Sequence, residues 1–156
     1  MVRVRAFLRI IREHEAKGFA EPYHALKWEG RKQITFSDLS THPYASSKED
    51  KPAGAYQIKY ATWNLVLKQT GWPKTFDPNM QDRVAIYLLQ ERPLEKMPHP
   101  RRTALGYILE GDVEKAVNET KLWELFAFLP GGEKQQQISM EKLSADFDKY
   151  TKEYSK

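Results

Sequence analysis

The stretch of sequence that decides the fold is Ala6-Phe7-Leu8-Arg9-Ile10-Ile11-Arg12-Glu13-His14-Glu15. Its apolar side chains recur at the spacing of one helix face, which predicts a helix over residues 1–17, with Gly18 as its stop. Glu15 continues the apolar stripe, although a carboxylate is costly to bury in its charged form. The predicted helix therefore places one unusual acidic residue near its C-terminal end.

Glu15 is a candidate general acid. Desolvation raises the pKa of a buried carboxyl group, and the negative end of the helix dipole further disfavours its charged form. A carboxyl group kept protonated near neutral pH can donate a proton to a leaving oxygen. Two structural explanations compete with this hypothesis. Glu15 could reach water from the edge of the stripe, or it could pair with Arg12 or a lysine.

The residues after this helix predict a β-hairpin, followed by a series of helices. The hairpin strands run from His24 to Trp28 and from Gln33 to Phe36, with Gly30 in the turn. Helices are expected at about residues 56–70, after Asp77-Pro78, at about 101–109, after Asp112, at about 121–128 and after Ser139. These elements predict an α+β fold, a mostly helical single domain over residues 1–156. A C-terminal helix at about residues 139–156 packs on it.

The composition is that of a globular protein and excludes several kinds of site. The chain has 156 residues, 25 Lys plus Arg against 21 Asp plus Glu, a formal net charge of +4 and no cysteine. Disulfides, thiol catalysis and cysteine-bound zinc are therefore excluded. The four histidines, at positions 14, 24, 42 and 99, lack the spacing of a metal site, so we expect neither a metal nor another cofactor.

Charge and hydropathy also narrow the choice of partners. A positive surface favours polyanions such as nucleic acid, anionic lipid or an acidic cell-wall polymer. The chain lacks a Lys/Arg cluster interleaved with aromatic residues, which argues against nucleic acid. No apolar run reaches the roughly 20 residues of a membrane span, so we expect no stable membrane insertion. Arg9 and Arg12 interrupt the N-terminal apolar stretch, so we expect no cleaved secretory signal.

A series of motifs follows Glu15 in one order along the chain. Ala6-Phe7-Leu8 precedes Glu15, and the later motifs are Phe36-Ser37-Asp38-Leu39-Ser40-Thr41-His42-Pro43, Ala53-Gly54-Ala55-Tyr56-Gln57, Phe76-Asp77-Pro78-Asn79-Met80-Gln81-Asp82-Arg83-Val84-Ala85, Gly111-Asp112-Val113 and Leu129-Pro130-Gly131. Together they resemble the lambda-type endolysins, a family of phage lytic transglycosylases. The resemblance covers about residues 5–132. Ala16 departs from the family pattern, in which glycine typically follows the acid.

The resemblance implies a lysozyme-like fold, with a small β-hairpin lobe beside the active-site cleft, and a substrate, the glycan strands of peptidoglycan. Glu15 would protonate the oxygen of the β-1,4 bond between N-acetylmuramic acid and N-acetylglucosamine. It would then deprotonate the muramic C6 hydroxyl, which closes a 1,6-anhydro ring. Asp38 and His42 would shape the wall of the cleft or bind sugar. Tyr56 would offer a stacking face, and Gln57 would bond acetamido groups.

The resemblance also implies where the protein acts. We expect a monomer made in the cytoplasm of a bacterial host, which reaches periplasmic or cell-wall peptidoglycan after release. The basic charge balance suits this anionic target, because positive surface raises the rate of encounter at low salt.

Other functions and roles stay open at this point. A hydrolytic lysozyme, or muramidase, on the same fold would require a second carboxylate. The candidates are Asp38 first, then Glu21, Glu29, Glu49 and Asp50. A non-catalytic peptidoglycan-binding module is a less favoured alternative. Tyr56 could belong to the core, His42 could merely anchor its loop, and we interpret Gln81 and Asp82 as structural capping groups.

Overall fold

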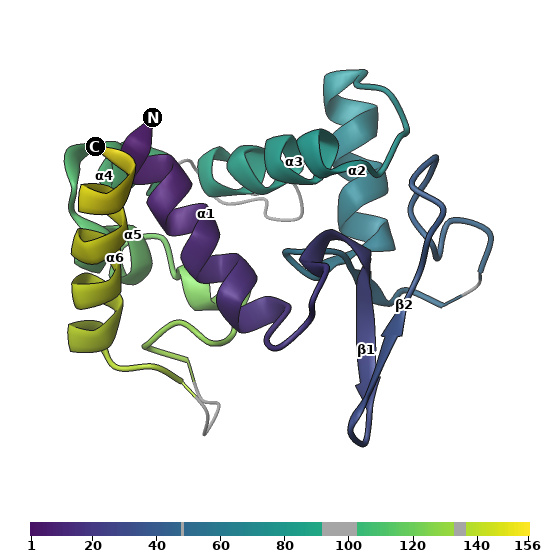
Figure 1. The fold of residues 1–156 in the computed structure, drawn as a ribbon. Coiled ribbons are helices and arrows are strands. Elements are labelled where there is room, and N and C mark those ends of the chain that lie inside the picture. Colours follow the sequence, from purple (N-terminus) through teal and green to yellow (C-terminus); the bar gives the residue numbers. More distant parts are fainter. Residues whose placement is uncertain (48, 92–102, 133–136) are drawn as a thin grey trace.

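The computed structural model describes residues 1–47, 49–91, 103–132 and 137–156, which fold into six α-helices and two small antiparallel hairpins (Figure 1). The α-helices are α1 Val2–Glu15, α2 Tyr60–Thr70, α3 Pro78–Gln90, α4 Ala104–Glu110, α5 Val113–Asn118 and α6 Met140–Tyr154. The strands are β1 Ala25–Glu29, β2 Lys32–Thr35, β3 Pro52–Ala53 and β4 Ile58–Lys59. Two 3-10 helices complete the described chain, η1 Pro22–His24 and η2 Leu122–Glu124.

The predicted early hairpin is confirmed. β1 and β2 pair antiparallel, with Trp28 opposite Gln33 and Glu29 opposite Lys32. Gly30 in the turn has a φ of +61°, a left-handed conformation that glycine adopts without steric cost. The hairpin projects from the molecule beside the C-terminal end of α1 (Figure 1). Alternation of strand residues around a glycine turn is local information, which is why the sequence predicts this element well.

A second, shorter hairpin overlaps the start of the segment predicted to be helical, since β4 falls within residues 56–70. β3 pairs with β4, so the helix expected from residue 56 begins only at Tyr60. Gly54, with a φ of +83°, and Gln57, with a φ of +49°, lie in the turn between the strands in conformations that a right-handed helix excludes. A Cβ atom at Gly54 would overlap the side-chain oxygen of Gln81. Close packing against α3 therefore requires glycine at this turn.

The predicted helix caps are confirmed where the signal is local. At the start of α3, α5 and α6 the side chain of the cap residue accepts a hydrogen bond from the backbone N–H three residues later. Asp77 accepts from Met80, Asp112 from Lys115 and Ser139 from Lys142. The helix predicted at 121–128 is wrong, because only η2 forms there after Lys121, whose φ is +50°. The helix predicted at 101–109 is observed as α4, and its first two residues lie outside the described part of the chain, as do Pro93, Pro98 and Pro100.

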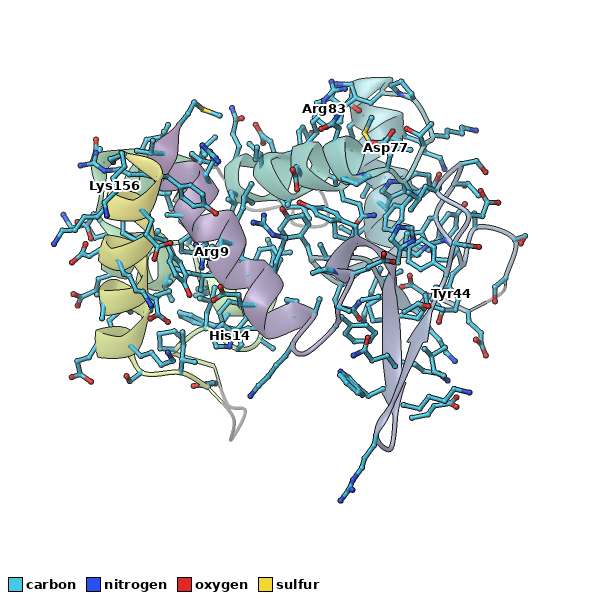
Figure 2. All side chains as sticks on the ribbon, viewed as in Figure 1. Arg9, His14, Tyr44, Asp77, Arg83 and Lys156 are labelled. Atoms are coloured by element: carbon cyan, nitrogen blue, oxygen red, sulfur yellow. The ribbon has the colours of Figure 1, made fainter. Side chains whose placement is uncertain are left out.

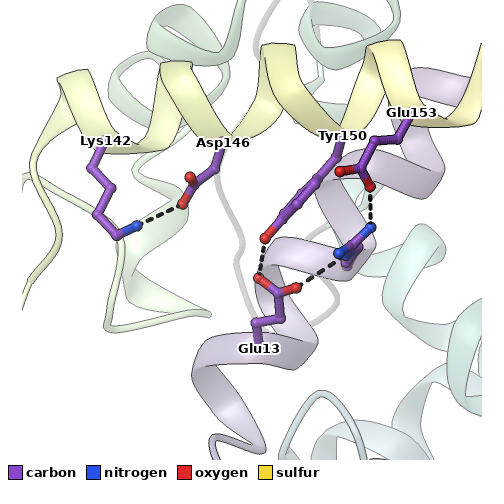
Figure 3. A network of polar contacts seen from close by, with 6 residues as sticks. Glu13, Lys142, Asp146, Tyr150 and Glu153 are labelled. Carbon is purple, nitrogen blue, oxygen red and sulfur yellow. Dashed lines mark hydrogen bonds and ion pairs between the residues drawn. The ribbon is translucent and has the colours of Figure 1, made fainter.

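The helical body is built around α1, and α6 packs along it so that the two termini lie close together (Figure 1). Phe147 of α6 meets Phe7 edge-on at 6.4 Å between ring centroids, and Leu143 is fully buried. A polar network also joins the two helices, in which Arg9 bonds to Glu13 and Glu153 (Figure 3). None of the helices in the described ranges has the length and apolar character to cross a membrane.

Candidate active site

Glu15 is the last residue of α1, at the point where the helical body meets the β1–β2 hairpin (Figure 1). Phe7 and Ile11, the residues before it on the stripe, are fully buried, whereas the Glu15 side chain is half-buried. Its neighbour His14 stacks on Phe128 at 4.5 Å, and burial followed by the charge of Lys142 lowers the pKa of that imidazole (Figure 2). The buried stripe thus ends in an acidic residue that is only half-buried.

The β1–β2 hairpin holds the turn that follows Glu15. Trp28 Nε1 donates a hydrogen bond to the carbonyl of Lys17 at 3.0 Å, and Gln33 Nε2 donates to the carbonyl of Gly18 at 2.9 Å. Gln33 Oε1 also accepts the N–H of Ala20 at 3.3 Å. Trp28 and Gln33 face each other across the hairpin, so we call these contacts the hairpin clasp. The clasp fixes the residues after Glu15 to the hairpin, although the helix itself has ended.

A half-buried polar cluster is built around Arg12, which lies on α1 one turn before Glu15. Arg12 Nη1 donates to the hydroxyl of Tyr56 at 2.9 Å, and that hydroxyl donates in turn to Asp82 Oδ1. Tyr23 donates to the same oxygen at 2.8 Å. These four residues, the Arg12 cluster, join α1, η1, the β3–β4 turn and α3. The cluster therefore ties together the segments that surround the end of α1.

The environment of the Arg12 cluster favours uncharged tyrosines. Burial raises the pKa of Tyr56 far above its usual range, the positive charge of Arg12 opposes the rise, and the hydrogen bond to Asp82 adds to it. Burial likewise raises the pKa of Tyr23, and its hydrogen bond to Asp82 acts in the same direction. Both phenols consequently remain donors to Asp82, whose negative charge balances Arg12.

Tyr56 does not offer the stacking face predicted for it. Its side chain is 1% exposed, and Tyr23 covers it edge-on with 6.3 Å between ring centroids. A ring enclosed in this way cannot lie against a sugar. The alternative assignment to the core is the one that the structure supports, with the hydroxyl as the linking atom of the Arg12 cluster.

Gln57 and Gln81 brace the β3–β4 turn. Gln57 is half-buried and its Nε2 donates to the carbonyls of Gly54 and Ala25, at 3.0 and 3.4 Å. Gln81 is fully buried, accepts the N–H of Ala55 at 2.9 Å and donates to the carbonyls of Tyr23 and Phe76. The side-chain amide of Gln57 thus donates its hydrogen bonds to backbone carbonyls of the protein itself. Neither Gln81 nor Asp82 caps α3 with its side chain, because the Gln81 amide bonds to the segments packed against α3 and the Asp82 carboxylate bonds to two tyrosines.

His42 lies in a different part of the molecule and is fully buried. Its Nε2 bonds to the carbonyl of Ile58 at 2.8 Å, its Nδ1 accepts the N–H of Tyr44 at 3.2 Å, and the ring packs 4.7 Å from Phe76. Burial lowers the pKa of His42, consistent with a neutral ring. Both ring nitrogens of His42 are therefore engaged inside the protein, which is the arrangement of a loop anchor and leaves the ring no nitrogen with which to bind a sugar.

Asp38 is exposed on the loop after β2. Its Oδ1 accepts both the N–H and the hydroxyl of Ser40, at 2.9 and 2.6 Å, and these bonds lower the pKa of the Asp38 carboxyl. This arrangement is a turn stabilised by its own aspartate. The structure therefore does not bring Asp38 and His42 together with Tyr56 and Gln57 through any contact between described side chains.

Three residues of the site lay beyond the sequence hypotheses: Tyr23, Trp28 and Gln33 act through contacts with distant parts of the chain. For Asp82, by contrast, the sequence contained a clue to its role. It stands five positions after the cap Asp77, too far along α3 to cap it, so a tertiary partner was the better expectation. Within the described ranges, no three His, Asp or Glu side chains gather as metal ligands would.

Comparison with known proteins decides the family. A family model described as endolysin matches residues 5–153. The chain belongs to the endolysin family. The match extends beyond the expected limit at residue 132 and covers α6 up to residue 153. An endolysin of Escherichia phage P2 is 34% identical over 126 residues, which cover 74% of this chain and 68% of that protein.

Solved structures agree with this assignment and confirm the lysozyme-like α+β fold. Bacteriophage lambda lysozyme complexed with a chitohexasaccharide superposes with a TM-score of 0.72 at 26% identity, covering 96% of this chain and 94% of that one. A second structure of lysozyme from bacteriophage lambda gives a TM-score of 0.71 at 25% identity, with the same coverage. This endolysin is accordingly a lysozyme-like enzyme that degrades peptidoglycan.

Proposed function

We propose that this endolysin cleaves the β-1,4 bond between N-acetylmuramic acid and N-acetylglucosamine by lytic transglycosylation. The Glu15 carboxyl group donates its proton to the glycosidic oxygen, and the N-acetylglucosamine leaves with a free hydroxyl. The Glu15 carboxylate then takes the proton of the muramic C6 hydroxyl, whose oxygen attacks C1 and forms the 1,6-anhydro ring. Glu15 ends the cycle protonated again, and no water is consumed.

The observation that carries this proposal is the placement of half-buried Glu15 at the end of the buried stripe, where α1 ends before the hairpin. The carboxyl group can meet a substrate there while α1 holds its backbone. The hairpin clasp on one side and the Arg12 cluster on the other restrain the same helix end. Such restraint supports an acid that must lie within hydrogen-bond reach of one particular oxygen.

The candidate second carboxylates support a mechanism with a single acid. All five are exposed, and four have partners in their own neighbourhood: Asp38 with Ser40, Glu29 with Lys27, Glu49 with Lys51 and Asp50 with the N–H of Ala61. A hydrolase that activates water needs a carboxylate directed at the far side of the sugar ring. Transglycosylation has no such requirement, because the substrate supplies the nucleophile.

The known relatives supply the substrate class. The lambda lysozyme that superposes on this chain was solved with a chitohexasaccharide, a chain of linked aminosugars. We infer that the present chain binds the glycan strand of peptidoglycan in the corresponding place. It acts on the bacterial cell wall after phage-directed release from the cytoplasm, and it works as a monomer.

Mass spectrometry of the products separates transglycosylation from hydrolysis. Purified peptidoglycan digested by the protein should yield muropeptides that are lighter by one water molecule than hydrolytic products and resist borohydride reduction. Reducible products would contradict the proposal and identify a hydrolytic muramidase. An absence of soluble products would leave a protein that binds the wall without cleaving it.

The role of Glu15 is tested by Glu15→Gln, which removes the transferable proton and keeps the shape of the side chain. We expect turbidity assays on purified cell walls to show a loss of activity of at least about a hundredfold. Glu13→Gln is the matched control on the same helix, because Glu13 bonds to Arg9 of α1 and Tyr150 of α6. A folded Glu15→Gln protein that retains wild-type lysis would overturn the assignment.

A further inference from the structure

Trp28 is an aromatic side chain that remains in contact with solvent. It is 43% exposed, and among the described residues Met1 and Leu109 are the other large apolar side chains with such exposure. Single exposed apolar residues are common on protein surfaces, so exposure alone says little. The position of Trp28 is more informative, because it lies on the hairpin that holds the turn after Glu15.

The Trp28 ring is held in a fixed orientation. Its Nε1 is bonded to the carbonyl of Lys17, two residues after Glu15, and its edge lies against Gly18. A Cβ atom at Gly18 would approach the ring to 3.0 Å, so a glycine there permits the contact. Phe19 packs beside the ring at 5.1 Å between centroids, with an angle of 56° between the planes. We call Trp28 and Phe19 the aromatic platform.

A rigid aromatic face beside the proposed acid suits a sugar ring. The substituents of a β-1,4-linked N-acetylhexosamine lie around the rim of the ring, which leaves a face of C–H bonds with a slight positive charge. An indole face carries the opposite partial charge and pre-organised, apolar area. The predicted stacking residue Tyr56 is buried and cannot serve. Trp28, which is exposed and bonded to the turn after Glu15, can take this role.

We propose that the face of Trp28, with Phe19 beside it, stacks on one N-acetylhexosamine ring of the glycan strand and sets how tightly the strand binds. This inference rests on the proposed function, since it places the same strand along the hairpin. It assigns an energetic role in binding to the ring face. It is distinct from the role of the Nε1–H, which positions the turn after Glu15 through the hairpin clasp.

The test measures binding without turnover. In a Glu15→Gln background, isothermal titration calorimetry with chitohexaose compares Trp28→Ala, Trp28→Phe and Leu109→Ala. Removal of a central aromatic contact should weaken binding roughly tenfold in Trp28→Ala. Trp28→Phe should stay within about threefold of the parent, because it keeps an aromatic face, although a smaller one, while it loses the N–H. Leu109→Ala, an equally exposed apolar residue on α4, should leave binding unchanged.

The outcomes separate the ring face from the hydrogen bond. Equal losses in Trp28→Ala and Trp28→Phe would overturn the inference, because they would show that the Nε1–H bond to Lys17 is what matters. Unchanged binding in Trp28→Ala would overturn it as well, as would a Glu15→Gln protein that does not bind chitohexaose. Should circular dichroism show Trp28→Ala to be unfolded, Trp28→Leu keeps apolar bulk at this position and removes the aromatic face.

Digestion of peptidoglycan by the wild-type protein decides the proposed function separately. Cleavage by the wild type together with unchanged oligosaccharide binding in Trp28→Ala would refute the aromatic platform and leave the proposed function standing. A wild-type protein that binds chitohexaose through Trp28 and yet releases no muropeptide would refute the proposed function and support the platform.

Discussion

Arg9 and Arg12 lie three residues apart on α1, and each is the centre of a network with a tyrosine and a carboxylate. The Arg9 network is at the surface: the side chains of Arg9, Glu13 and Glu153 are 32%, 43% and 41% exposed (Figure 3). The Arg12 cluster is enclosed, with a fully buried Tyr56 and a half-buried Asp82. The first network fastens α6 to the body, and the second fastens the β3–β4 turn and α3 to the proposed site.

The difference in burial predicts different energetic weight for similar contacts. Exposed ion pairs contribute little, because water and salt screen the charges and the long side chains lose freedom. A hydrogen bond to a charged group inside the protein counts for more, and the loss of one partner leaves the others desolvated without compensation. The Arg9 network also stacks its guanidinium 3.9 Å over the Tyr150 ring, a contact that does not depend on an anion.

The largest effect is expected from removal of the half-buried carboxylate of Asp82. Asp82→Ala deprives Tyr23 and Tyr56 of their common acceptor and leaves Arg12 without its counter-charge. We expect the free energy of unfolding to fall by about 2–3 kcal/mol, measured by urea denaturation, together with a loss of lytic activity.

Glu153→Ala is the matched control, since it removes a carboxylate that Arg9 bonds at 2.7 Å on the surface. Its cost should stay below about 1 kcal/mol, with activity unchanged. Equal costs for the two variants would show that burial does not distinguish the networks.

Loss of a tyrosine hydroxyl should also cost more stability in the Arg12 cluster than in the Arg9 network. The difference should be smaller than for the two carboxylates. Tyr56→Phe removes the hydroxyl that links Arg12 to Asp82, and Tyr150→Phe removes a single hydrogen bond to Glu13. The expected losses of stability at neutral pH are about 2 and about 1 kcal/mol. Similar melting temperatures for both variants would contradict the comparison.

The pH dependence of the free energy of unfolding provides a separate test of Tyr150. Burial and then the hydrogen bond to Glu13 raise the pKa of Tyr150 to about 12, whereas an unfolded tyrosine titrates near 10. The folded protein thus keeps a proton that the unfolded chain releases, so stability falls as pH rises through this window and is full below it. Tyr150→Phe should flatten the slope of unfolding free energy between about pH 10 and pH 11 by one proton's worth. An unchanged slope would contradict the raised pKa.

The smallest effect concerns salt. Arg9→Met keeps apolar length over Tyr150 and removes both ion pairs, so its cost should be about 0.5 kcal/mol at low salt and shrink as ionic strength rises. Arg12→Met is the counterpart in the enclosed cluster, and its larger cost should persist at high salt. Thermal unfolding at several sodium chloride concentrations measures both. If the stability cost of Arg9→Met did not change with salt, the predicted contrast between the Arg9 network and the Arg12 cluster would be wrong.

Local signals in the sequence predicted much of the fold. Asp77-Pro78, Asp112 and Ser139 begin helices because a side-chain oxygen three residues away satisfies a free N–H, which needs no information from elsewhere in the chain. The hairpin around Gly30 is equally local. The start of α2 was placed too early because the turn at Gly54 and Gln57 is imposed by Gln81, more than twenty residues away.

The candidate site shows the same division. The ordered motifs were sufficient to indicate the family, and the periodic stripe singled out Glu15 as the proposed acid. Exposure of the aromatic residues was not predictable. Tyr56 belongs to a motif of the site and is buried, whereas Trp28 stands in a hairpin that no motif covers and reaches solvent. Neighbours along the chain do not reveal which face of a ring the rest of the molecule will cover.

The sequence by itself determined the helix that carries Glu15, the adjacent hairpin and the caps of α3, α5 and α6, because each depends on spacing within one segment. Only the tertiary structure decided that His42 and Tyr56 lie inside, that Asp82 serves two tyrosines and that Trp28 faces solvent beside the turn after Glu15. These outcomes depend on which distant segments come into contact, and the desolvation that distinguishes a buried group from an exposed one arises only when the whole chain has packed.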